Sequence, residues 1–286
     1  MSVCSLCPND CKIDRNKKVG FCGVNENVRI AKYYQHKFEE PCISGTNGSG
    51  TVFFCGCSLK CVFCQNYSLS RVERGKIISV KELADIFKQL EDMGAHNINL
   101  VTPTQYADKI MQALDIYKPN VPIVYNTHGY EKISILERLN KYVDVYLPDL
   151  KFFSPDVSNR YTGKKDYFEV ASSVVKFMIE SKPLTFDKDG LIKSGVIVRH
   201  LVLPQNVNDT KKILDWFKNF DGRAYINVMS QYTPFGQIDS FPELKRKLTK
   251  REYQAVIDYA ISLDLKNMFY QDMISSSKEY IPSWDF

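Results

Sequence analysis

The sequence has little of what indicates a membrane, secreted or disordered protein. No apolar run approaches the roughly 18 residues of a transmembrane helix, and the start, MSVCSLCPNDCK, has no apolar stretch of the kind found in signal peptides. Charge is nearly balanced, with 38 Lys and Arg against 33 Asp and Glu, so the net charge of +5 gives no reason to expect nucleic acid as a partner. Hydrophobic residues make up 44% of the chain, which is enough for a full core. We therefore expect a globular, cytoplasmic protein with no membrane partner.

Cysteine is absent from residues 65–286, and all nine cysteines lie in residues 1–64. A cytoplasmic compartment keeps thiols reduced, so clustered cysteines there indicate metal ligands or catalytic thiols before disulfides. The odd number also fits disulfide pairing poorly.

Short apolar runs alternate with amphipathic stretches from residue 51 onward, which predicts alternating strands and helices. Strands are expected at 51–54, 98–101, 122–126, 143–147, 195–203 and 224–229. Helices are expected near 79–93, 102–118, 131–140, 167–181, 209–219 and 250–263. This order is typical of a parallel sheet, and six units favour an α/β fold of the partial (β/α)6 TIM-type barrel kind over the full eight-unit barrel. A doubly wound open sheet is the alternative, and both place the site at the carboxyl ends of the strands.

The pattern also divides the chain and marks two helix starts. Residues 1–50 are expected to form a small Cys-rich N-terminal metal-binding segment, and residues 51–286 a core barrel with an aromatic, irregular tail after residue 270. Ser79 and Glu82 form a capping box. Thr102 is expected to be the N-cap of the next helix, because proline follows it at the first helical position.

Three cysteines, Cys57, Cys61 and Cys64, follow the first predicted strand directly. Thiolates are the ligands of iron–sulfur clusters, and four of them normally fill a four-iron cluster. Three thiolates leave one iron without a protein ligand, and an open metal position is what a catalytic site keeps for its substrate. A zinc site or a set of buried, inert thiols is the alternative.

The CxxxCxxC spacing, with the aromatic Phe63 before the last cysteine, resembles the motif of the radical S-adenosylmethionine (SAM) superfamily. The resemblance implies a [4Fe-4S] cluster on Cys57, Cys61 and Cys64 that chelates SAM through the open iron. It also implies an electron donor of the flavodoxin or ferredoxin type. The products of SAM cleavage are then methionine and a 5′-deoxyadenosyl radical, which abstracts a hydrogen atom from the substrate.

Further motifs resemble the homologue group of pyruvate formate-lyase activating enzyme. They are CSLCP, EEPCISG, GSGTVFF, CQNYSLS, LVTPTQY, YNTHGY, DVYLPDLKF, VRHLVLP and MSQYTP, in that order. The leading substrate that this resemblance implies is a glycine in a partner glycyl-radical enzyme. A radical SAM enzyme acting on a small molecule or peptide, and a non-catalytic metal-binding interaction module, are the alternatives.

The resemblance also assigns residues to SAM binding. Asp149 and Lys151 match the family motif whose side chains hold SAM, and a surface ion pair is the alternative for them. Of Arg199 and His200, strand alternation lets only one point inward. A Gly-Gly-Glu segment of the family is replaced here by Val101 to Thr104. The cofactor-binding residues implied in this way are Phe63, Thr102, Asn126, Thr127, His128, Asp149, Lys151, Arg199 and Gln231.

Four more cysteines, Cys4, Cys7, Cys11 and Cys22, lie close together near the start. Four thiolates can close a tetrahedral zinc site or hold a second iron–sulfur cluster, and spacing does not separate the two. Partly oxidised free thiols are the alternative. Cys42 and Cys55 are expected to be small buried hydrophobic residues, although Cys42 is also a candidate reactive thiol and Cys55 lies near the cluster loop.

Overall fold

The computed structural model describes residues 3–270, and its centre is one open, mostly parallel sheet. The strands run β10–β9–β8–β6–β5–β4–β2–β1–β3, with β7 on β8 off this path. Every pair from β2 to β10 along the path is parallel, while β1 pairs antiparallel with β2 and β3. The strand bounds are β1 (Val28–His36), β2 (Ser49–Phe54), β3 (Lys76–Ile78), β4 (Ile98–Val101), β5 (Ile123–Thr127), β6 (Val145–Pro148), β7 (Thr185–Phe186), β8 (Ile192–Leu201), β9 (Tyr225–Met229) and β10 (Met268–Tyr270). The sheet does not close, which is the arrangement of a partial barrel.

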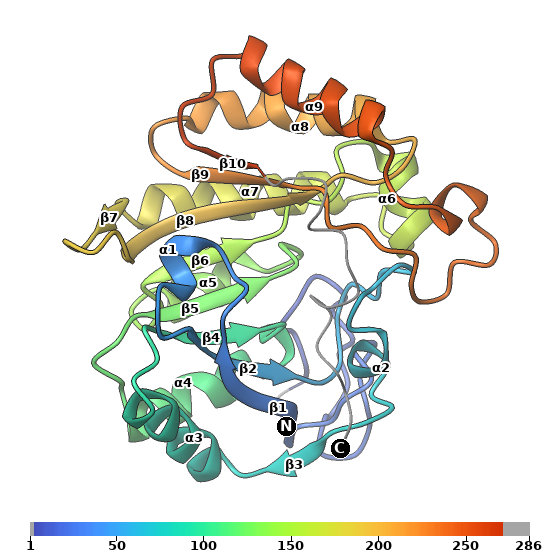
Figure 1. Cartoon of the computed structure of the whole chain (residues 1–286). Coiled ribbons are helices and arrows are strands. Elements are labelled where there is room, and N and C mark those ends of the chain that lie inside the picture. The colour runs from blue at the N-terminus through green and yellow to red at the C-terminus, as the bar shows by residue number, and fades with distance from the viewer. Residues whose placement is uncertain (1–2, 271–286) are drawn as a thin grey trace.

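Helices join the parallel strands and cover the outer side of the sheet. Figure 1 shows α8 and α9 over β9 and β10, with α3 and α4 at the opposite end of the sheet. The bounds are α1 (Pro41–Ser44), α2 (Tyr67–Ser70), α3 (Val80–Asp92), α4 (Ala107–Ile116), α5 (Ile133–Leu139), α6 (Pro155–Thr162), α7 (Tyr167–Ser181), α8 (Val207–Phe217) and α9 (Lys250–Ser262). In the described part of the chain, no helix has both the length and the apolar character needed to cross a membrane.

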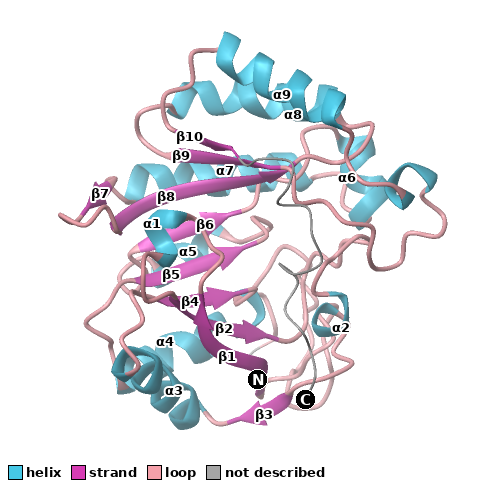
Figure 2. Ribbon diagram, in the orientation of Figure 1, coloured by secondary structure: helices cyan, strands magenta, loops and turns pink. Residues whose placement is uncertain are grey.

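Loops gather at the carboxyl ends of the parallel strands, on the side to which the arrowheads in Figure 2 point. The N-terminal loops and α2 lie on this side (Figure 1). All six predicted strands and all six predicted main helices are present within a few residues of their expected bounds. The tail expected after residue 270 lies outside the described residues.

Helix α3 shows why the periodicity was informative. The Ser79 hydroxyl accepts a hydrogen bond from the Glu82 backbone at 3.1 Å, and the Glu82 carboxylate accepts one from the Ser79 backbone at 2.7 Å. These two bonds satisfy N–H groups that the first turn leaves open. Leu83, Phe87 and Leu90 on one face are fully buried, which fixes the helix against the sheet.

Thr102 is not the N-cap that its sequence context suggests. Its φ is +57°, a left-handed conformation that is strained for a β-branched residue. A short 3₁₀ turn, Thr104–Tyr106, precedes α4, and Pro103 stands at its start without a side-chain cap. The strained turn directs the chain out of β4 and into the site, so local capping chemistry gives way to the geometry of the site.

Strand β1 was not expected, because residues 1–50 show little periodicity. Residues 28–36 pair with both β2 and β3, so this part of the N-terminal segment extends the sheet. The division of the chain at residue 50 stays a prediction.

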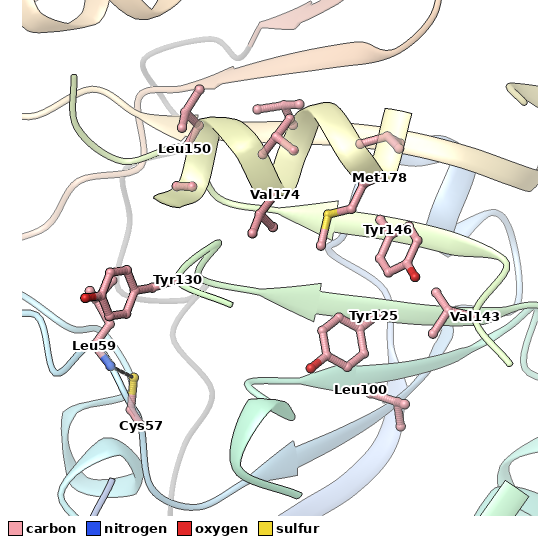
Figure 3. Packing of buried hydrophobic residues seen from close by; sticks show 14 of the residues in the cluster. Cys57, Leu59, Leu100, Tyr125, Tyr130, Val143, Tyr146, Leu150, Val174 and Met178 are labelled. Atoms are coloured by element: carbon pink, nitrogen blue, oxygen red, sulfur yellow. Dashed lines mark hydrogen bonds between the residues drawn. The ribbon is translucent and has the colours of Figure 1, made fainter. Parts of the chain in front are cut away.

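Alternation along the strands separates an outer face from an inner face. Tyr125 and Tyr146 pair across β5 and β6, their rings meet edge to face at 6.2 Å, and both are fully buried. Figure 3 shows them on the side of the sheet where Met178 of α7 lies. The intervening residues face the inside of the barrel, and one of them, Asn126, lines the site described next.

Candidate functional site

One cavity of about 200 Å³ lies at the carboxyl ends of the parallel strands. Residues from five strand ends and from the loop after β2 contribute to its wall. Every residue that the sequence assigned to the three-cysteine cluster or to SAM lines it: Cys57, Cys61, Phe63, Cys64, Thr102, Asn126, Thr127, His128, Asp149, Lys151, Arg199 and Gln231. The structure thus brings together residues spread over 175 positions of the chain, from 57 to 231.

In the three-cysteine loop, backbone N–H groups are directed at the sulfur of Cys57. The N–H groups of Leu59 and Lys60 point at the Cys57 Sγ, at 3.4 and 3.5 Å, and Figure 3 draws the first of these bonds. Gly56 has a φ of +83°, and a Cβ there would lie 2.8 Å from the Cys22 carbonyl oxygen, so only glycine fits. Backbone N–H donors aimed at a sulfur favour the thiolate, which is the form that binds a metal.

The thiols need a cation to become thiolates in this place. Burial raises the pKa of Cys57, Cys61 and Cys64 above the ordinary thiol value. Buried anions are costly unless a positive charge faces them, and a bound metal deprotonates a coordinating thiol. Three thiols around one cavity therefore fit an iron–sulfur cluster with one open iron.

The described residues, 3–270, contain no group of three or more His, Cys, Asp or Glu side chains already placed around one point to hold a single metal ion. A single zinc ion needs its sulfur ligands within about 2.3 Å of one centre. A four-iron cluster binds each thiolate through a different iron.

Asp149 and Lys151 form a buried ion pair at the floor of the cavity. The Lys151 Nζ lies 2.6 Å from the Asp149 carboxylate, and their side chains are only 18% and 15% exposed. Arg199 Nε adds a contact to Asp149 at 3.3 Å. Burial works to raise the pKa of Asp149, but the two cations outweigh it and hold that pKa below its ordinary value. The pair lines the cavity and is not a surface pair, and its charges suit the carboxylate, amino and sulfonium groups of SAM.

Arg199 points inward and its neighbour His200 does not. The Arg199 guanidinium reaches Asn126 Oδ1 at 2.8 Å across the barrel. The His200 ring lies on the opposite face, 2.7 Å from the Leu150 carbonyl and 2.9 Å from the Thr210 hydroxyl. Strand alternation thus places one of the two in the site, as the sequence predicted.

His128 is held as a neutral ring. Its Nε2 lies 2.8 Å from the Ser58 hydroxyl, one residue after Cys57. Burial, with the positive charge of Lys151 as a further cause, lowers the pKa of His128 to about 3. A neutral imidazole at this point links β5 to the cysteine loop by hydrogen bonding without adding charge to the cavity.

Glu131 is a buried acid that the sequence analysis did not single out. Its Oε1 accepts hydrogen bonds from the hydroxyl groups of Thr104, at 2.6 Å, and Thr127. Its Oε2 has no hydrogen-bond partner among the described residues. Burial raises the pKa of Glu131 to about 7, although both hydroxyl groups oppose the rise. A single glutamate after a strand carries no sequence signal for such burial.

The raised pKa of Glu131 predicts a pH effect on stability. From pH 4.5 to about 7 the carboxyl is ionised in the unfolded chain but protonated in the folded one, so stability falls as pH rises through this window and stays reduced above it. The gap corresponds to roughly 3 kcal/mol. Glu131→Gln cannot ionise, so the free energy of unfolding of this variant relative to the native protein should rise by about that amount between pH 4.5 and pH 8. Anaerobic urea unfolding at both pH values measures this, and a pH-independent difference would contradict it.

The N-terminal cysteines pack directly against the three-cysteine loop. The Cys57 N–H donates to the Cys22 carbonyl at 3.2 Å, and Asn9 Nδ2 donates to the Ser58 carbonyl at 2.7 Å. The Phe21 N–H points at the Cys11 Sγ at 3.3 Å, and a Cβ at residue 20 would lie 3.6 and 3.4 Å from the sulfurs of Cys11 and Cys22. The two sulfurs therefore share one turn, while a metal on the four cysteines stays a prediction.

The remaining cysteines, the half-buried Cys42 and the buried Cys55, stand apart from the cofactor cavity. Cys55 is fully buried, and its Sγ lies 3.2 Å from the Arg74 carbonyl. Burial raises the pKa of Cys42 to about 12, which is the opposite of what a reactive thiol needs. Neither lines the cofactor cavity, so the small-hydrophobe expectation suits both.

Comparison with known proteins decides the family. The profile of the Radical SAM superfamily matches residues 51–217. The chain belongs to the radical SAM superfamily. The matched range contains the whole three-cysteine loop and the strands from β4 to β8. A [4Fe-4S] cluster and SAM are therefore the cofactors of this chain's family, and the cavity is where this radical SAM chain would hold them.

The chain is also similar to individual proteins and solved structures. The chain is 33% identical over 273 residues to the uncharacterized protein MJ0674 of Methanocaldococcus jannaschii, covering 92% of this chain and 75% of that protein. Among solved structures, Streptococcus suis SuiB bound to the precursor peptide SuiA gives a TM-score of 0.54 at 17% identity, over 78% of this chain and 48% of SuiB. SuiB bound to S-adenosylmethionine gives 0.53 at 18%, over 80% and 51%. The chain thus spans about half the length of SuiB, and the likeness shows a shared fold.

Proposed function

We propose that this radical SAM enzyme cleaves SAM reductively and abstracts a hydrogen atom from a glycine in a partner glycyl-radical enzyme. The observation that carries the first part is the convergence of the three thiols of Cys57, Cys61 and Cys64 and the Asp149–Lys151 pair on one cavity. When bound, the cluster and SAM together supply methionine and a 5′-deoxyadenosyl radical, given one electron from a flavodoxin- or ferredoxin-type donor. The motif resemblance to pyruvate formate-lyase activating enzyme supports the second part.

The chain's own residues would bind and orient SAM and keep water out of the cavity. Lys151 is the cation best placed to pair with the SAM carboxylate, and Asp149 accepts from the amino group or faces the sulfonium. The Tyr167 hydroxyl accepts a hydrogen bond from the Lys151 N–H at 3.0 Å and lies 2.9 Å from the carbonyls of His128 and Asp149. This fully buried tyrosine fixes the two strand ends relative to each other. Phe63 packs edge-on against three aromatic rings beside the cysteine loop and keeps water from that side.

The direct test is product formation. Protein purified and reconstituted without oxygen, then reduced in the presence of SAM, should release 5′-deoxyadenosine and methionine in equal amounts. Chromatography with mass detection measures both. Absence of 5′-deoxyadenosine from protein with full cluster content would contradict the proposal. For the partner, a glycyl-radical enzyme encoded nearby in the same genome should acquire a glycyl radical, visible by electron paramagnetic resonance, only when this protein and SAM are present.

We further propose that Cys4, Cys7, Cys11 and Cys22 hold a second metal, as zinc or as a second iron–sulfur cluster. Burial raises the pKa of Cys7, to about 11, and of Cys22, so these thiols also need a cation to ionise. A metal there would brace the backbone carbonyl of Cys22, which accepts the Cys57 N–H. Zinc, iron and sulfide analysis of anaerobically purified protein separates the two identities.

A further inference from the structure

A second cavity adjoins the cofactor cavity. It has a volume of about 250 Å³ and shares Arg199, Met229 and Gln231 with the cofactor cavity. Asn227 also lines it, and Asn227 and Met229 lie on the same face of β9. The second cavity therefore lies beside the cofactor cavity, with Arg199 between them.

The wall of this cavity carries two buried hydrogen-bond acceptors that have no partner among the described residues. They are Glu40 Oε2 and Asn227 Oδ1, and the two residues are 5% and 4% exposed. Their other polar atoms are occupied, since Asn227 Nδ2 donates to Glu40 Oε1 at 2.7 Å. A buried acceptor left unpaired costs about 1–3 kcal/mol, so a ligand that supplies several N–H donors would be stabilised here.

The charges around the second cavity indicate which class of ligand it would bind. The cation Lys151 is paired with Asp149 at 2.6 Å, and Arg199 is paired with Glu39 at 3.1 Å. Among the described residues, the Glu40 side chain accepts a hydrogen bond only from the neutral amide of Asn227, and neither cation lies within hydrogen-bonding distance of it. A carboxylate this deeply buried is stabilised by a cation that also donates hydrogen bonds.

We propose that this cavity is a substrate subsite that takes a guanidinium or ammonium group, with Glu40 as its counter-ion and Asn227 as a further acceptor. The proposal rests on the proposed function, because a cation held there leaves the rest of the substrate beside SAM, in line for hydrogen abstraction. An arginine or lysine side chain of a polypeptide and a free small amine share this chemistry.

The test compares two probes of equal size on the reconstituted holoenzyme with SAM bound. n-Butylguanidinium carries the cation, and n-butylurea replaces it by a neutral group of the same shape. By titration calorimetry the native enzyme should bind the guanidinium at least about 10-fold more tightly, as one charge-assisted hydrogen bond implies. Equal affinity, or no binding of either probe, would overturn the subsite. This comparison needs no variant.

Variants place the effect at Glu40. Glu40→Gln keeps an oxygen for Asn227 but removes the charge, and it should abolish the preference for the guanidinium. Glu131→Gln is the matched control, because it also neutralises a buried glutamate with an unpaired oxygen, yet Glu131 does not line this cavity. It should keep the preference. A Glu40→Gln enzyme that folds and retains the preference, or that loses SAM affinity instead, would overturn the assignment.

Two further measurements distinguish a free amine from a polypeptide as the ligand, and the subsite proposal from the proposed function. Agmatine stands for a free amine and the capped tripeptide acetyl-Gly-Arg-Gly-amide for a polypeptide. The probe that binds more tightly identifies the source of the cationic group, provided that Glu40→Gln weakens its binding. If Glu40→Gln weakens the binding of neither probe, the result counts against the subsite. Release of 5′-deoxyadenosine without any probe is recorded in parallel. If no 5′-deoxyadenosine is released but the enzyme still prefers the guanidinium, the proposed function alone is refuted. If 5′-deoxyadenosine is released but the enzyme shows no preference for the guanidinium, the subsite alone is refuted.

Discussion

Replacing Cys61 by alanine should abolish the release of 5′-deoxyadenosine while leaving any metal on the N-terminal cysteines in place. Cys61 is buried and lines the cofactor cavity between its two partner cysteines. Removing one of three protein ligands leaves two, so the cluster loses the site that presents one open iron to SAM. Activity should fall to background, because SAM cleavage has no route without that iron. Iron and sulfide content, measured on the same sample as product, should fall with it.

Two other cysteine variants serve as controls for Cys61→Ala. Cys22→Ala removes a thiol of the N-terminal group but keeps the Cys22 backbone carbonyl that accepts the Cys57 N–H, so it should lose the second metal and retain SAM cleavage. Cys55→Ala removes a fully buried thiol outside the cavity, and it should retain both metals. Full SAM cleavage by Cys61→Ala would remove Cys61 from the ligand set and with it the proposed mechanism.

The sheet and most of the site followed from the sequence because each depended on local chemistry. Apolar runs such as INLV at 98–101 are too short for helices and lie between helix signals, so they could only be buried strands. The resemblance to the radical SAM superfamily assigned Asn126, Asp149 and Arg199 to one site, and this agrees with the rule that the carboxyl ends of parallel strands meet at one edge. The pattern CxxxCxxC then fixed which end of the barrel carries the chemistry.

Other features depended on contacts that no local pattern records. β1 has no clean alternation, and its pairing with β2 and β3 provides the stabilisation that its own pattern does not predict. Thr102 carries good N-cap chemistry, but its neighbours in the cavity hold it at a positive φ. Glu40 and Glu131 look like ordinary acidic residues in the sequence, yet both are buried. A buried charge is visible only once the elements around it are placed.

The second large effect is expected from removing the charge of Lys151. Lys151→Ala should weaken SAM binding by about 10- to 100-fold, the range expected when one charge-assisted hydrogen bond is lost, while cluster content changes little. Lys151 is not a thiol and ligates no iron. Its loss leaves Arg199 as the remaining cation paired with Asp149 among the described residues, so the cavity becomes more negative where the SAM carboxylate is expected. Repulsion between two carboxylates adds to the lost attraction.

Equilibrium binding of SAM and iron content, measured on one preparation, separate the two effects of Lys151→Ala. Lys109→Ala is the matched control, because Lys109 also pairs with a carboxylate at 2.6 Å, that of Glu26, but outside the cofactor cavity. An exposed pair of this kind contributes about 0–1 kcal/mol, so SAM affinity should stay unchanged there. Unchanged SAM affinity in Lys151→Ala would instead make the Asp149–Lys151 pair a structural one. Equal loss of iron and SAM binding would show that the lysine acts by supporting the cysteine loop.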